Sequence, residues 1–262
     1  FSLNEHIVLS VVAVFIGLLV GYGAISFRAL IGLFQTLFMG DGHEGVVAIV
    51  RTLPWWQILL MPAFGGLMVG VLVHFFFRHA QIQGVPEVMA AVALHNGKMG
   101  LRNGLVKTVA SALSIGCGAS VGREGPVIHL GATLASAVGR RLMMSPRHMR
   151  TMVGCGAAAG IAASFNAPIA GVMFSLEVIL ADYGLATFSP IVLSSVIATV
   201  VARMHLGDYP AFIVPHYTLV SAWEIPAYVG LGLLCGATAI LFMTTLFKTE
   251  ELVAKVVMPR ML

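Results

Sequence analysis

Short apolar segments separated by glycine and proline, rather than by polar loops, are the feature that most limits how this chain can fold. They occupy residues 84–92, 101–119, 125–142, 150–163, 167–180 and 187–204. Several are shorter than the roughly 20 residues that a helix needs to cross a bilayer. Interrupted apolar segments of this kind are typical of discontinuous helices in membrane proteins. Because an unpaired backbone group is costly in lipid, we expect the broken ends to line a buried polar site or a water-filled path.

Longer apolar runs flank these segments, at residues 7–39, 55–78 and 223–258. Hydrophobic residues make up 58% of the chain and charged residues only 10%, whereas an ordinary soluble domain carries roughly 25% charged residues. This composition excludes a soluble enzyme, a disordered chain and a nucleic-acid reader. The sequence therefore predicts an all-α integral membrane fold that crosses the bilayer several times and contains discontinuous, re-entrant helices.

The net charge of +4 does not indicate a nucleic-acid partner, because most of the cations lie between apolar runs. Such cations are typical of cytoplasmic loops, and the positive-inside rule places the start of the chain in the cytoplasm. We expect the lipid bilayer as a partner and the inner or plasma membrane of a bacterium as the location. The three cysteines and nine histidines show no metal-ligand spacing, so we expect no metal and no cofactor.

The pentapeptide Gly-Arg-Glu-Gly-Pro at residues 122–126 combines a helix start with an acid. Pro126 suits the first helical turn, and the glycines allow a tight turn with exposed N–H groups. A helix that begins here directs its positive dipole end into the membrane, where it can bind an anion. Glu124 could occupy that site when ionised and vacate it when protonated. A glutamate in a first turn also stabilises the dipole, but an ionisable residue inside a membrane favours the functional interpretation.

Residues 83–87, Gln-Gly-Val-Pro-Glu, repeat this arrangement, since Pro86 opens a second short helix. Two such breaks form a stronger signal than one. The small residues of 154–163 have a plainer interpretation, because glycine and alanine let helices pack closely. For Glu177, a structural role as an interfacial acid or as the partner of an arginine is as well supported as a functional one.

Three segments resemble signature motifs of the CLC family of chloride channels and chloride/proton antiporters. Residues 122–126 match the GREGP motif, residues 83–87 resemble GSGIPE, and residues 165–171, Phe-Asn-Ala-Pro-Ile-Ala-Gly, resemble FNAP(L/I)AG. The resemblance extends from about residue 7 to residue 258. It implies a homodimer in which each subunit has its own pore and is built from two halves of inverted topology.

The resemblance also implies a domain organisation. Residues 1–222 correspond to the first inverted-repeat half, and residues 223–262 to the first long helix of the second half. The remainder of the family fold has no match in this sequence, and the chain opens at Phe1 rather than at a methionine. We therefore expect a piece of a longer protein. Residues 167–204 match helices that form part of the family's dimer interface, so we expect a homodimer through them.

Roles follow from the resemblance for the residues of two motifs. Glu124 corresponds to the external glutamate that gates the pore and relays protons. The anion-binding set that the resemblance implies comprises Gln83, Gly84, Val85, Gly122, Arg123, Gly125 and Pro126. Two positions depart from the family pattern. Gln83 replaces the usual serine, and Val178 stands where typical antiporters carry an internal proton-transfer glutamate.

The expected function is voltage-independent or pH-gated transport of chloride or a related monovalent anion across a membrane. The sequence allows both chloride/proton antiport, with protons as a second partner, and passive channel conduction. An alternative is a non-transporting membrane interaction module or an incomplete half-transporter, supported by the missing second half. An intramembrane enzyme would need a nucleophile–base pair or a metal cluster. Ser114 and Ser120 have no evident histidine partner, so we do not expect an enzyme.

Overall fold

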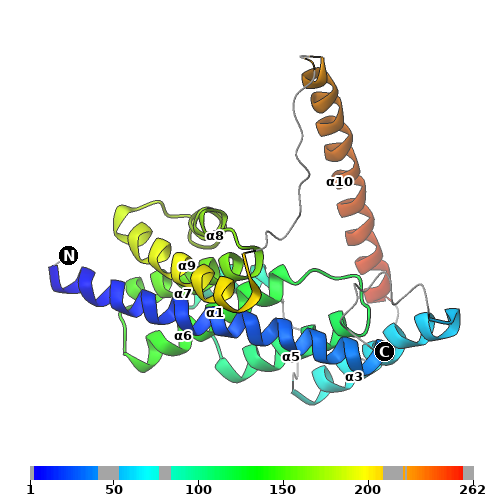
Figure 1. Ribbon diagram of the computed structural model, residues 1–262, viewed down its shortest axis with the longest axis horizontal. Coiled ribbons are helices and arrows are strands. Elements are labelled where there is room, and N and C mark those ends of the chain that lie inside the picture. The colour runs from blue at the N-terminus through cyan, green and yellow to red at the C-terminus, as the bar shows by residue number, and fades with distance from the viewer. Residues whose placement is uncertain (1–2, 41–52, 77–83, 209–220, 222, 256–262) are drawn as a thin grey trace. The chain divides into compact units, whose positions relative to one another are not determined.

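The computed structural model describes residues 3–40, 53–76, 84–208, 221 and 223–255 (Figure 1). In these ranges the chain is helical and contains no strand. The helices are α1 (Leu3–Met39), α3 (Trp55–Phe76), α4 (Val85–Leu94), α5 (Leu101–Gly116), α6 (Glu124–Arg141), α7 (Pro146–Phe165), α8 (Pro168–Phe174), η1 (Ser175–Leu180), α9 (Leu185–Leu206) and α10 (Glu224–Lys255). The chain divides into two compact units, Phe1–Ala211 and Phe212–Leu262. The first unit contains every helix up to α9, and the second contains α10.

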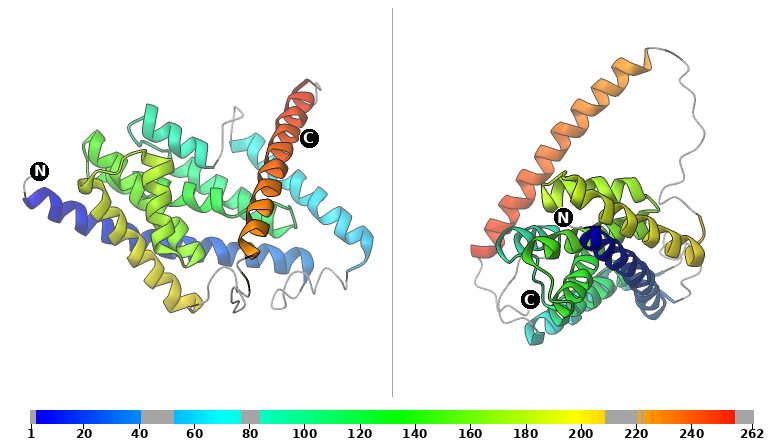
Figure 2. Two further views of the ribbon diagram at one scale, coloured as in Figure 1. Left: turned by 90° about the horizontal axis from the view of Figure 1, so that it is seen from above. Right: turned by 90° about the vertical axis from the view of Figure 1, so that its left-hand side faces the viewer.

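Helix α7 forms the centre of the first unit, where it contacts α1, α6, α8 and α9 (Figure 2). Residues 151–163 of this helix are all buried, and most of them are glycine or alanine. The packing against α6 is especially close, because a Cβ atom added to Gly131 or to Gly156 would collide with the carbonyl oxygen of the other glycine. The packing interpretation of the small residues in 154–163 therefore fits the structure.

The shorter helices are arranged around this core. Helix α5 packs against α1 and α6, and α3 packs against α5. Helix α4 lies on α6 and η1, where Val88 and Val92 join a second apolar cluster with Ile128 and Val153. The packing of α4 brings one broken helix end close to another, which positions the site described below.

The helices follow the predicted segments, with two informative differences. Helix α7 begins at Pro146 rather than at residue 150, because the hydroxyl of Ser145 accepts a hydrogen bond from the backbone N–H of His148. The segment 167–180 is not one α-helix, since α8 changes into the wider π-helix η1 at Ser175. The hydroxyl of Ser175 donates to the carbonyl of Gly154 at 2.8 Å, which ties the wide turn to α7.

Among the residues that the structure describes, four helices are long and apolar enough to cross a membrane: Glu5–Met39, Trp55–Phe76, Leu185–Leu206 and Glu224–Thr249. The apolar stretches Val85–Leu94 and Pro168–Leu180 are shorter. A mixture of spanning and shorter apolar helices is what the sequence predicts. The all-α, multi-pass membrane class with interrupted helices is confirmed.

Candidate functional site

The N-terminal ends of α4 and α6 meet in the folded chain. Gly84 immediately precedes α4, and Gly125 lies in the first turn of α6. A Cβ atom built on either glycine would lie 3.8 Å from the Cα of the other, so the two backbones pack directly against each other. The structure thus brings together the two breaks that the sequence places far apart. We refer to this place as the paired helix ends.

Both helix ends leave backbone N–H groups uncapped. Within the described part of the chain, neither N-cap residue, Gly84 nor Arg123, accepts a hydrogen bond from its helix with its side chain. The first-turn N–H groups have no partner inside the helix, and Pro86 and Pro126 lie where a missing N–H costs nothing. The two helix dipoles place partial positive charge at the same point. The paired helix ends are therefore suited to bind an anion.

Gly84 has a backbone conformation that explains why a glycine stands there. Its φ is +79° and its ψ is −141°, a combination that residues with a Cβ atom rarely adopt. Val85, which follows it, is half-buried at the start of α4. Gln83, the predicted replacement for the family's serine, lies outside the described residues.

Glu124 is the first residue of α6 and is exposed. Its carboxylate lies over the backbone of Gly122, because a Cβ atom at Gly122 would collide with Oε2 of Glu124. Residue 122 must therefore lack a side chain for the carboxylate to take this position. An ionised carboxylate at the start of α6 is attracted by the positive end of the helix dipole, where it would compete with an anion.

The side chain of Arg123 points to a different element. Its guanidinium lies over the ring of Phe165, 5.7 Å from the centroid, and Nη2 is 3.5 Å from the carbonyl oxygen of Ser164. Both partners belong to the end of α7. Contact between Arg123 and an anion at the paired helix ends would therefore involve its backbone rather than its guanidinium.

A cavity of about 490 Å³ lies beside the paired helix ends. Gly84, Gly122 and Pro126 line it, and the facing wall comes from residues of α3 and α5. Ser111 and Ser114 of α5 add two hydroxyl-bearing side chains to this wall. The cavity gives a small ligand room to approach the helix ends.

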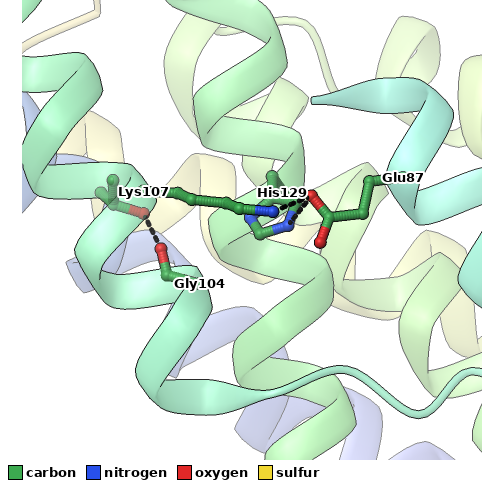
Figure 3. Close-up of polar contacts among 5 residues, drawn as sticks. Glu87, Gly104, Lys107 and His129 are labelled. Atoms are coloured by element: carbon green, nitrogen blue, oxygen red, sulfur yellow. Dashed lines mark hydrogen bonds and ion pairs between the residues drawn. The ribbon is translucent and has the colours of Figure 1, made fainter. Parts of the chain in front are cut away.

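A cluster of three ionisable side chains that are far apart in the sequence stands next to this cavity. Oε2 of Glu87 lies 2.6 Å from Nζ of Lys107 and 3.0 Å from Nε2 of His129 (Figure 3). The three residues come from α4, α5 and α6 respectively. Lys107 and His129 are buried, with side chains 6% and 5% exposed, whereas the side chain of Glu87 is 26% exposed.

Part of this cluster had a signal in the sequence. Lys107 is a cation within an apolar segment, and a charge inside a membrane segment requires a partner. Glu87 is an acid in a predicted first turn. Their pairing could not be predicted, because helical periodicity in one chain does not show which segments are neighbours.

The third motif of the sequence forms a turn that is anchored to the end of α9. Asn166 ends α7 with a left-handed φ of +56°. Its Oδ1 accepts a hydrogen bond from Nε of Arg203 at 2.6 Å, and its Nδ2 donates to Oδ1 of Asp208 at 2.8 Å. The motif at residues 165–171 thus fixes the junction between α7 and α8.

Glu177 and Val178 lie on η1, which packs against α4, α7 and α8. Glu177 is exposed. Val178 lines a separate cavity of about 530 Å³, together with Arg147 and Arg150. The structure therefore places an apolar side chain, rather than an acid, at the position that the resemblance links to internal proton transfer.

Comparison with known proteins identifies the family. The profile described as "Voltage gated chloride channel" matches residues 65–262. The chain belongs to the CLC family. It is 36% identical over 255 residues to a putative chloride channel protein ClcB-like of Ralstonia nicotianae, covering 96% of this chain and 59% of that protein. It is 34% identical over 241 residues to chloride channel protein CLC-e of Arabidopsis thaliana, covering 87% of this chain and 33% of that protein.

Solved structures show the same fold. A slow cyanobacterial Cl⁻/H⁺ antiporter matches with a TM-score of 0.78 and 23% identity, over 95% of this chain and 58% of that one. A CLC-type fluoride/proton antiporter matches with a TM-score of 0.71 and 25% identity, over 90% of this chain and 56% of that one. The predicted family and fold class are confirmed. This CLC chain spans little more than half the length of these structures.

Proposed function

We propose that this CLC chain takes part in the transport of chloride or a related monovalent anion across a membrane. One observation carries the proposal: the uncapped N-terminal ends of α4 and α6 meet beside Glu124. Two helix dipoles and several free N–H groups directed at one point can replace part of an anion's hydration shell. The match to the CLC profile and the names of the relatives support the same function.

The anion-binding set at this site consists mainly of backbone. Gly84, Val85 and Gly125 lie at the paired helix ends, and Pro126 shapes the first turn of α6. Gly122 and Arg123 form the loop over which the carboxylate of Glu124 lies. Gln83 precedes this set in the sequence and is proposed to offer its amide to the anion. No resident cofactor has a role in this proposal, since chloride is the transported ligand.

Glu124 is the proposed gate. Its ionised carboxylate satisfies the same N–H groups that an anion would use, so the two compete for one position. Protonation removes the negative charge and releases the helix ends to the anion. Flux through such a site increases as the pH falls, and the movement of the carboxyl group can carry a proton.

Two modes of transport are compatible with this gate. Antiport would use Glu124 as a proton relay, and one similar structure is described as a CLC-type fluoride/proton antiporter. Passive conduction would use it only as a plug, and the relative in Ralstonia nicotianae is named as a channel protein. Val178 supplies no carboxyl group at the internal position, which keeps passive conduction open as a mode.

The assembly we propose has two levels. Residues 1–222 form the first half of an inverted repeat, residues 223–262 begin the second, and two subunits associate through residues 167–204 in a bacterial inner membrane. Partial coverage of the relatives supports the first level. The second is supported by apolar side chains exposed on α8 and α9, namely Ile169, Met173, Leu185, Phe188, Val196, Val200 and Met204.

The decisive experiment measures anion efflux from liposomes that contain the full-length protein, while a pH electrode follows protons. Chloride efflux with stoichiometric proton movement in the opposite direction would establish antiport. Efflux without coupled protons would establish passive conduction. Liposomes that retain chloride as well as protein-free liposomes do would refute the proposed function and favour a non-transporting interaction module.

A further inference from the structure

The cluster of Glu87, Lys107 and His129 has no part in the function proposed so far, although it lies on the helices that form the anion site. Glu87 is in the first turn of α4, three residues after Gly84. His129 lies on α6, three residues after Pro126. One carboxylate oxygen therefore links the helix behind one anion-binding end to the helix behind the other, and Figure 3 shows it facing both nitrogen atoms.

Two of the three residues in this cluster line the cavity beside the paired helix ends. Among the described residues that line the cavity beside the paired helix ends, Lys107 and His129 are present and Glu87 is not. The cavity also reaches Gly84, Gly122 and Pro126. An anion at the helix ends would therefore share its cavity with two residues of the cluster, Lys107 and His129.

Burial gives the ammonium group its effect. The side chain of Lys107 is only 6% exposed, and a charge so shielded from water acts over longer distances than one on a surface. An unpaired buried cation would be costly, and Glu87 offsets that cost. The same carboxylate partly cancels the positive potential that Lys107 extends into the cavity.

We propose that the Glu87–Lys107–His129 cluster sets the anion affinity of the paired helix ends. Lys107 supplies a fixed positive charge that attracts the anion, and Glu87 moderates that charge. His129 positions that carboxylate against α6, since its Nε2 lies 3.0 Å from Oε2 of Glu87. The inference rests on the proposed function, since it assigns a positioning role for the same anion.

Two substitutions test this proposal because they predict opposite results. Lys107→Met removes the attracting charge, and it should raise the chloride dissociation constant by about tenfold. Glu87→Gln keeps a hydrogen-bonding group but removes the moderating charge, so it should lower that constant by several fold. The loss of a merely structural ion pair would weaken binding in both variants. Isothermal titration of chloride into the purified full-length protein measures both constants.

Matched controls separate charge from position. Lys107→Arg retains the cation and should leave chloride affinity close to that of the wild type. Lys98→Met removes a lysine that is exposed in the loop between α4 and α5, and it should leave the chloride dissociation constant unchanged. If Lys107→Met does not yield folded protein, Glu87→Gln decides alone. Tighter chloride binding supports the proposal, and unchanged or weaker binding overturns it.

The test also distinguishes this inference from the function on which it rests. A wild-type protein that neither binds nor transports chloride would refute the proposed function. A wild type that binds chloride, with variants at Glu87 and Lys107 that shift affinity in the same direction or not at all, would refute only the role of the cluster.

Discussion

Two pairs of glycines in this CLC chain bring helices together, and they do so for different reasons. Gly131 and Gly156 lie in the buried contact between α6 and α7, where an added Cβ atom would collide with a backbone carbonyl. Gly84 and Gly125 lie at the paired helix ends, where an added Cβ atom would be 3.8 Å from its neighbour, an ordinary contact distance. The first pair lacks side chains because there is no space for them.

The second pair has space, so its glycines need another explanation. At Gly84 the explanation is the backbone angle, since φ is +79°. At Gly125, whose backbone is helical, it is access to the N–H groups of an uncapped helix end. A glycine pair can thus leave backbone N–H groups accessible to a ligand, as at Gly84 and Gly125, which we call the open pair. It can also allow close helix packing, as at Gly131 and Gly156, which we call the closed pair.

The largest effect is expected at the closed pair. Gly156→Val would place three carbon atoms against the carbonyl of Gly131, and overpacking of this kind costs about 3 kcal/mol or more. We expect the variant to lose its cooperative thermal unfolding transition in detergent. Gly32→Val is the matched control, because nothing lies within 4 Å of a Cβ atom built there. A Gly156→Val protein as stable as the wild type would remove the basis of the contrast.

The next effect concerns the gate beside the open pair. Glu124→Gln replaces the carboxylate with a neutral group of the same shape, which imitates the protonated gate. Chloride efflux from liposomes should become independent of pH, and any coupled proton movement should fall to background. Glu177→Gln neutralises another exposed glutamate, on η1, and should leave the pH dependence intact. Efflux that still varies with pH in Glu124→Gln would contradict the gating role.

A smaller effect separates the two glycines of the open pair. Gly84→Ala should cost about 1–3 kcal/mol of stability, because alanine is strained at this φ. Gly125→Ala should change stability by no more than about 0.5 kcal/mol, since its site is helical and has space. Both methyl groups would obstruct the N–H groups, so both variants should bind chloride more weakly. Thermal unfolding and chloride titration give the two quantities, and normal chloride affinity in Gly125→Ala would argue against an anion at this helix end.

The smallest effect is expected at Gln83, which precedes Gly84 in the sequence. Gln83→Ser exchanges an amide donor for a hydroxyl, which should shift the preference among chloride, nitrate and bromide without abolishing flux. Gln57→Ser, at the start of α3, is the control for the same chemical change. Permeability ratios measured in liposomes would decide the matter, and identical ratios would exclude a filter role for position 83.

Much of the fold was accessible from the sequence because its signals are local. Proline and glycine at 84–86 and 122–126 predicted where two helices begin, and both begin there. The cap formed by Ser145 also has a local cause but was missed, which made the predicted start of α7 too late. The change to a π-helix at Ser175 was missed for another reason, since Ser175 bonds to the carbonyl of Gly154 on a different helix.

The candidate site was predictable in part. The acid at Glu124 and the uncapped helix ends follow from residue type and order alone. That the ends near Gly84 and Gly125 face each other is decided by the packing of α4 on α6. That the guanidinium of Arg123 turns toward Phe165 depends on where α7 ends.

The sequence by itself determined that the chain lies in a membrane, that its helices are broken, and which acid is the proposed gate. Hydrophobicity and the backbone limits of glycine and proline act within a few residues, so they can be read from the sequence alone. Only the tertiary structure decided which broken ends meet and which charges pair. Glu87, Lys107 and His129 belong to three helices, and a buried charge takes the partner that packing brings within reach.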